Sequence, residues 1–178
     1  MIAPGEQQRL LALARRALEA RVRGGSAPLV EDDDVIPAGA FVTIHRHGEL
    51  RGCLGRLECD WPLNRIVMHL ASIVADSDPR FEPVTPDELP HIAIEISLLT
   101  LDRPIASLDD IEVGRHGLIV EQGRRRGLLL PQVASEHGWD ARTFVEHTCR
   151  KAGLAPDGWQ HGARVSVFEA FVFGEHPA

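Results

Sequence analysis

Apolar residues recur with a helical period in the first part of the chain. Between residues 7 and 22 they fall on one side, with the arginines largely on the other, and Gly24 favours a helix end. A second amphipathic stripe follows over 63–74, and Asp60 is placed to cap that helix. The residues between the two helices, 24–37, combine glycine, serine, proline and an acidic run, which predicts a connecting loop.

Other segments alternate with a period of two, which predicts strands. His47 and Gly48 join the first two strands in a two-residue turn, with glycine supplying a positive φ. The last strand is apolar on both faces, as expected for a central and buried position. The runs predicted as strands are 41–46, 49–54, 92–98, 118–120, 127–130 and 165–173.

Two shorter helices complete the pattern. Pro131 ends a strand and starts one of them, and Asp140 is placed to cap another that ends near Gly153. The strands pair first as a hairpin and the helices do not alternate regularly with them. This order predicts an α+β fold with a mainly antiparallel sheet flanked by helices, a larger lobe and a smaller lobe.

The two-residue turn also predicts a register for the first hairpin. Continued from the turn, the pairing places Ile44 opposite Arg51 and Val42 opposite Cys53. Arg51 and Cys53 then share one face of the sheet, and His45 lies on the opposite face.

Length and charge limit the class of protein. The 178 residues suit one core with a smaller lobe, and the net charge of -7 makes a nucleic-acid partner unlikely, although a local basic patch stays open. Three cysteines without paired spacing do not form a disulfide framework, and no apolar run is long enough to cross a membrane. We expect a soluble cytoplasmic protein.

The run from Arg51 to Gly55 is the strongest candidate for chemistry. Glycine weakens a strand, so Gly52 and Gly55 on either side of Cys53 indicate a bulge or a close approach by backbone or ligand. A neighbouring guanidinium favours the thiolate, which is the reactive form of cysteine. The alternative is a buried structural thiol, which is a common role for free cysteine. Cys149 lies on a helix stripe and is expected in the core, whereas Cys59 has no special context.

A nucleophilic cysteine needs a group that accepts its proton. His116 lies in a turn-like segment and is the preferred base, although a surface histidine is the competing interpretation. Glu95 occupies the polar side of an apolar strand, where it could orient His116, act as the base, or pair with Arg51. Pairing with Arg51 is the preferred role.

Further residues are candidates for binding an anionic group. Arg80, close after Asp78, could reach a carboxylate or phosphate, or could clamp its own loop through Asp78. Gln132 could line the same cleft through its amide or make a local structural bond. The run 124–126 is three arginines at a hairpin tip, and such a run is most often a solvated turn.

No metal site is predicted. His45 and His47 have ligand-like spacing, but His47 falls in the predicted turn and need not share a face with His45. The sequence also lacks paired-cysteine and histidine-glutamate metal motifs. The cofactor, if there is one, stays unknown.

A set of segments keeps a characteristic order along the chain: 39–43, 50–55, 78–81, 94–97, 113–118, 126–134 and 149–154. Together they resemble the AMMECR family, whose bacterial and archaeal members are also called AmmeMemoRadiSam system protein A. The resemblance covers residues 7–175 as a single domain of this type, with the smaller lobe within 111–155. It implies an α+β fold and an association with a Memo-like protein and a radical S-adenosylmethionine enzyme, but no assigned reaction. Leu54 stands where the family motif usually has isoleucine, a change that should leave the site intact.

Three hypotheses of function follow from the residues and the resemblance. The preferred one is an enzyme or enzyme subunit with a cleft centred on Cys53 that acts on a small anionic substrate. The second is a binding or adaptor module for the two associated proteins, in which the glycines serve only close backbone contact. The third and weakest is modification or binding of RNA or another nucleic acid through Arg80 and the arginines of 124–126.

Overall fold

The computed structural model describes residues 2–31, 33, 35–57 and 59–175. The chain forms two compact units. Unit 1 contains the residues up to 98 and those from 171 onward, and unit 2 contains residues 99–170. The predicted smaller lobe, 111–155, falls within unit 2. Helices and mainly antiparallel strands occur in both units, so the predicted α+β class is confirmed.

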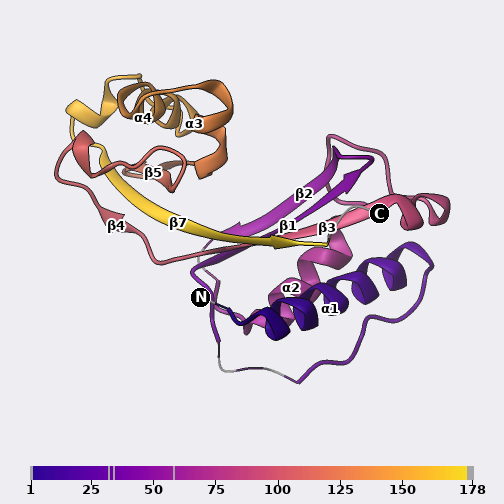
Figure 1. The fold of residues 1–178 in the computed structure, drawn as a ribbon. Coiled ribbons are helices and arrows are strands. Elements are labelled where there is room, and N and C mark those ends of the chain that lie inside the picture. Colours follow the sequence, from indigo (N-terminus) through magenta and orange to yellow (C-terminus); the bar gives the residue numbers. More distant parts are fainter. Residues whose placement is uncertain (1, 32, 34, 58, 176–178) are drawn as a thin grey trace. The chain divides into compact units, whose positions relative to one another are not determined.

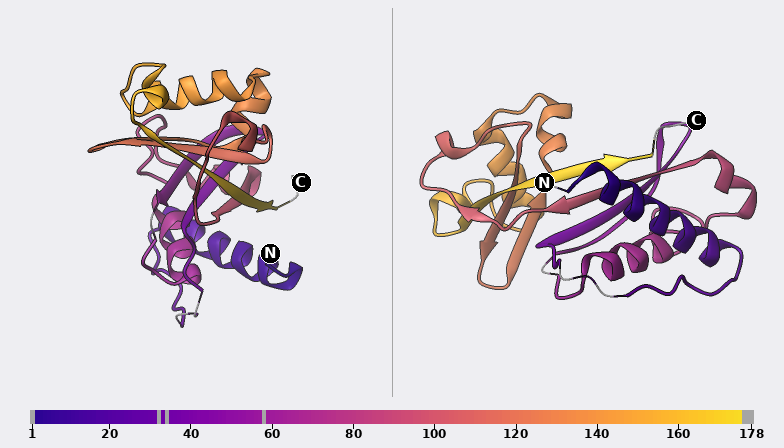
Figure 2. Two further views of the ribbon diagram at one scale, coloured as in Figure 1. Left: turned by 90° about the vertical axis from the view of Figure 1, so that its left-hand side faces the viewer. Right: turned by 60° about the horizontal axis from the view of Figure 1, so that its bottom comes forward.

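Unit 1 is a sheet with two helices on one face. Its strands lie in the order β2-β1-β3-β7, and helices α1 and α2 pack side by side beneath them (Figures 1 and 2). Isoleucines and valines from β1 and β3 meet leucines from both helices in one apolar core. The elements are α1 (Pro4–Val22), β1 (Gly39–Arg46), β2 (Glu49–Leu57), α2 (Leu63–Ile73), the 3-10 helix η1 (Pro86–His91), β3 (Ile92–Leu99) and the end of β7 (Arg164–Gly174).

The β1–β2 hairpin has a different register from the predicted one. The turn is as expected, with positive φ at His47 and Gly48, but a bulge between Ile44 and His45 leaves Arg51 as an extra residue on β2. Beyond the bulge, Thr43 rather than Val42 opposes Cys53. Because one residue of shift exchanges the two faces, His45 lies on the same face as Cys53, and the predicted opposite placement was wrong.

The N-terminus of α2 is capped from a distance. We expected Asp60 to cap this helix, but Asp60 is paired with Arg56 (3.2 Å) and no side chain next to the helix caps it. Instead, the main-chain N–H groups of Leu63 and Asn64 donate to the two oxygens of Asp33, at 2.9 and 3.2 Å. The connecting segment 24–38 therefore holds a structural carboxylate against the start of α2.

Unit 2 is a smaller sheet covered by two helices. Strands β5 and β6 form the predicted hairpin, β7 lies between β4 and β5, and α3 and α4 pack on the face that carries Leu118 and Val120. Asp140 caps α4 as expected by accepting from the Thr143 N–H at 2.7 Å. The elements are β4 (Arg103–Pro104), η2 (Leu108–Asp110), β5 (His116–Gln122), β6 (Arg125–Leu129), α3 (Pro131–His137), α4 (Ala141–Lys151), η3 (Gly158–Gln160) and the start of β7.

Candidate functional site

Cys53 lies on the face of the unit 1 sheet that points away from the helices. The neighbouring Gly52 faces the helices, because a Cβ there would lie 3.2 Å from the Val74 carbonyl oxygen. Alternation along the strand therefore turns Cys53 to the other side, where the thiol is half-buried. The Thr43 hydroxyl donates to Cys53 Sγ at 3.2 Å from the opposing strand. A donor at this position stabilises negative charge on sulfur.

Packing accounts for both glycines of the motif. A Cβ at Gly52 would also come within 3.2 Å of Ile44 Cγ1, and one at Gly55 would come within 2.1 Å of the Phe41 ring. The close approach predicted at these glycines is therefore made by the protein itself, through the Val74 carbonyl oxygen and the side chains of Ile44 and Phe41. Their predicted part in binding a ligand stays a prediction.

Asp78 and Arg80 fasten the outer edge of β2. The Cys53 N–H donates to Asp78 Oδ2 at 2.9 Å, and the Arg80 guanidinium donates to both Asp78 oxygens and, at 3.5 Å, to the Cys53 carbonyl. The hydrogen bonds from Arg80 hold the pKa of the buried Asp78 carboxyl well below its usual range, despite the opposing effect of burial. The local clamp is therefore present, and it holds the backbone of Cys53. The Arg80 side chain is still 55% exposed, so part of its fork faces solvent.

Arg51 is held by Glu88 and not by Glu95, so the preferred pairing was wrong. Arg51 Nε and Nη2 donate to the two oxygens of Glu88 at 2.9 and 3.1 Å, and Arg46 adds a further bond at 3.0 Å. The bond from Arg51 is the main reason that the pKa of Glu88 falls to about 2. Glu88 belongs to η1, a helical turn in a proline-rich stretch. Its capping box with Thr85 explains why the turn forms.

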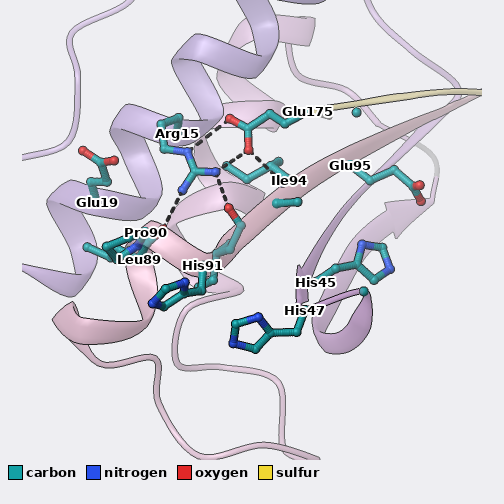
Figure 3. A pocket seen from close by; sticks show the side chains of 14 residues that line it. Arg15, Glu19, His45, His47, Leu89, Pro90, His91, Ile94, Glu95 and Glu175 are labelled. Carbon is teal, nitrogen blue, oxygen red and sulfur yellow. Dashed lines mark hydrogen bonds and ion pairs between the residues drawn. The ribbon is translucent and has the colours of Figure 1, made fainter. Parts of the chain in front are cut away.

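The face that carries Cys53 continues toward a groove in unit 1. His45 follows Thr43 on the same face of β1, about 6.6 Å further along the strand. Glu95 lies on this face of β3, because Ile94 and Ile96 point into the core. Both His45 and Glu95 line the groove (Figure 3). His45 and Glu95 therefore lie on the same side of the sheet as the Cys53 thiol.

The groove has a volume of about 980 Å³ and lies at the hairpin end of the sheet. His47 and His91 both line it and their rings are in contact, with ring centres 5.1 Å apart (Figure 3). Arg15 and Glu175 form an ion pair in its wall, and Arg15 also donates to two main-chain carbonyls, so this pair braces α1 against β3 and β7. His91 is not among the residues predicted from the sequence, where His45 was considered as a metal ligand, rejected in that role, and placed on the face opposite Cys53. No pattern in the sequence signals that the hairpin turn and η1 meet.

His116 and Gln132 belong to unit 2. His116 is not a loop residue: it begins β5, is buried, and its Nδ1 accepts the Glu112 N–H at 3.0 Å. In the neutral ring Nε2 then carries the hydrogen, so service as a base would require this bond to break. Gln132 lies in the first turn of α3 and is half-buried. Their predicted roles in catalysis and binding stay predictions.

Cys59 and Cys149 are the other two thiols of the chain. Burial raises the pKa of both thiols, and Cys149 lies in the core of unit 2 as expected. Within the described part of the chain, no three histidine, cysteine or acidic side chains are grouped closely enough to hold a metal ion. The described helices include none with the length and apolar character needed to span a membrane.

Comparisons with known proteins agree with the motifs. The family model described as AMMECR1 matches residues 11–173. A protein of Methanosarcina acetivorans is 41% identical over 98% of this chain and 94% of its own length, and one of Methanothermobacter thermautotrophicus is 45% identical over 96% and 94%. The crystal structure of an uncharacterised protein from Pyrococcus horikoshii superposes with a TM-score of 0.88 at 38% identity, covering 99% of this chain and 94% of that one. The chain therefore belongs to the AMMECR1 family.

Proposed function

We propose that this protein is an enzyme, or a subunit of one, in which the Cys53 thiolate is the reacting group. The observation that carries the proposal is the 3.2 Å hydrogen bond from the Thr43 hydroxyl to Cys53 Sγ. A core thiol needs no such donor, whereas a reacting thiolate is stabilised by one. Asp78 and Arg80 support the same atom indirectly, since they fix the main chain on both sides of it.

The residues around Cys53 supply the other parts of such a site. Arg80, whose side chain is 55% exposed, is the proposed contact for an anionic group of the substrate. Glu95 and His45 are proposed to move protons, since both line the groove on the face of the thiol. The substrate would then extend from Cys53 along β1 into the groove.

Alkylation of the three thiols tests the proposal. Iodoacetamide at neutral pH should modify Cys53 about tenfold faster than Cys59 or Cys149, because alkylation needs thiolate. Burial raises the pKa of the other two thiols and keeps them protonated. Peptide mass spectrometry follows each site separately. Equal rates at Cys53 and Cys59, which are both half-buried, would contradict the proposal.

A binding or adaptor module is the second candidate. It is supported by the packing of Gly52 and Gly55, which explains the motif without chemistry, and by exposed apolar side chains in the segment 24–38. Leu29 is 99% exposed there, and Ile36 is 60% exposed. The proposed partners are the Memo-like protein and the radical S-adenosylmethionine enzyme that the family resemblance implies.

The two candidates give opposite results for one variant. A Cys53→Ser protein should fold normally under either. If the protein is an adaptor, this variant keeps partner binding and complements a deletion strain, whereas Leu29→Ser with Ile36→Ser loses both. If the protein is an enzyme, Cys53→Ser fails to complement although it still binds.

A further inference from the structure

Unit 2 carries exposed basic side chains on two segments that are distant in the sequence. Arg124 and Arg125 lie at the tip of the β5–β6 hairpin, and Arg150 and Lys151 end α4. All four side chains are exposed. The net charge of the protein is -7, so four cations in one region would differ strongly from the rest of the chain.

The fold brings the two segments into contact. Arg125 Nη1 donates to the Gly153 carbonyl oxygen at 3.1 Å, directly after the end of α4. Gly127, further along β6, packs so closely that a Cβ there would come within 2.3 Å of the Ala152 nitrogen. The hairpin tip and the end of α4 therefore adjoin. We refer to Arg124, Arg125, Arg150 and Lys151 as the basic patch.

Carboxylates neighbour the basic patch, among them Glu146, which lies one helical turn before Arg150 on α4. Of the neighbouring carboxylates, Glu121 pairs with Arg126 at 3.1 Å and Asp157 contacts His161 at 3.2 Å. No described residue forms an ion pair with any member of the basic patch. Four exposed cations without acidic partners create a local positive potential, which attracts an anionic partner.

We propose that the basic patch binds the phosphate backbone of a nucleic acid. Three of its four members are arginines, whose forks fit phosphate oxygens. A protein partner would call for an apolar centre, but the large exposed apolar residues of the described chain lie elsewhere, at Leu29, Val35, Ile36, Leu50, Leu101, Val113 and Val172. Backbone contacts alone give binding without sequence preference. This inference is independent of the role of Cys53.

The salt dependence of binding tests the proposal. Fluorescence anisotropy with a labelled single-stranded RNA and a labelled DNA duplex should show affinities that fall as salt rises. Four phosphate contacts give a slope of log K against log salt of about -2.8 for the single strand and about -3.6 for the duplex. The nucleic acid that binds more tightly at a given salt concentration is the preferred one. Absence of binding to both at about 50 mM salt would overturn the proposal.

Two double variants distinguish a local effect of the basic patch from an effect of the net charge of the protein. Arg124→Gln with Lys151→Gln removes two charges that form no ion pair, and should lower the single-strand slope by about 1.4. Arg16→Gln with Arg23→Gln removes two exposed charges from unit 1 and is the matched control, which should leave the slope unchanged. Equal losses in both variants would refute a local site. Binding of polyglutamate but not of nucleic acid would also refute it.

The acylation rate of Lys151 reports directly whether nucleic acid covers the basic patch, because Lys151 is the only lysine in the sequence. An amine-reactive acylating reagent will therefore modify Lys151 and the N-terminal amine alone. Saturating nucleic acid should slow acylation of Lys151 several-fold and leave the N-terminal amine unaffected. Unchanged acylation of Lys151 under conditions where anisotropy shows binding would place the nucleic acid elsewhere and overturn the proposal.

Discussion

Asp33 should stabilise unit 1 although it lies in a connecting segment. Its two carboxylate oxygens accept N–H groups from the first turn of α2, from Leu63 at 2.9 Å and Asn64 at 3.2 Å. The Leu63 N–H also donates to the Val35 carbonyl oxygen at 2.7 Å, so an Asp33→Ala variant leaves the Asn64 N–H without this acceptor and the Leu63 N–H with one acceptor fewer. Loss of a helix cap costs about 1 kcal/mol, and because the lost acceptor is charged the expected cost is about 1–2 kcal/mol. The ion pair of Asp33 with Arg9, at 3.6 Å and partly exposed, adds little.

Asp60→Ala is the matched control. Sequence order alone predicts Asp60 as the cap of α2, so that prediction would place the loss of stability at Asp60 instead of Asp33. Asp60 is 72% exposed and only pairs with Arg56, so its removal should change the free energy of unfolding by less than about 0.5 kcal/mol. Urea unfolding followed by far-ultraviolet circular dichroism measures both variants. Equal stability of Asp33→Ala and the parent, or a larger loss for Asp60→Ala, would refute the capping assignment.

Three further predictions concern the surroundings of Cys53. Because the pKa of Glu88 is about 2 in the folded protein and near 4.5 otherwise, its pairing with Arg51 stabilises the fold above pH about 4.5, and this contribution is lost as the pH falls toward 2. Glu88→Gln should therefore lower the unfolding free energy by about 2–3 kcal/mol at pH 7 but by much less near pH 2, whereas a constant difference across this range would contradict the assignment. Gly55→Ala should destabilise by about 1–3 kcal/mol through the clash with Phe41, and a second change, Phe41→Leu, should recover part of the loss in thermal unfolding. Gly5→Ala, in the first turn of α1 where nothing lies within 4 Å, should not destabilise, because alanine is the better helix former. Asp78→Asn should weaken the Arg80 clamp, which amide exchange at Cys53 will report as reduced protection, while Asp87→Asn should not alter it.

The elements of the fold were largely predictable because their signals are local. Helical stripes, alternating strands and the His47-Gly48 turn depend on neighbouring residues, and the Asp140 cap lies directly before its helix. The cap of α2 was missed for the opposite reason. Its carboxylate lies 30 residues earlier in the chain, and no local pattern connects Asp33 to Leu63.

The site was predictable only in its centre. Cys53, Asp78 and Arg80 are joined by hydrogen bonds as components of one region, although their chemical roles stay predictions. The partner of Arg51 and the face of His45 were wrong, because a single bulged residue at Arg51 shifts every pair beyond it. Gly52 and Gly55 indicated either a bulge or a close approach, but they did not show at which residue the pairing shifts, so the exchange of faces needed the structure.

The central claim is that the Thr43 hydroxyl activates the Cys53 thiol, and the alkylation rate of Cys53 in Thr43 variants tests it most directly. A hydrogen bond worth about 1 kcal/mol changes the rate about fivefold, so Thr43→Val should slow iodoacetamide at Cys53 by about that factor. Thr43→Ser keeps the hydroxyl and should retain the parental rate, and the rate at Cys149 should be the same in all three proteins. Equal rates at Cys53 in the valine and serine variants would contradict the account.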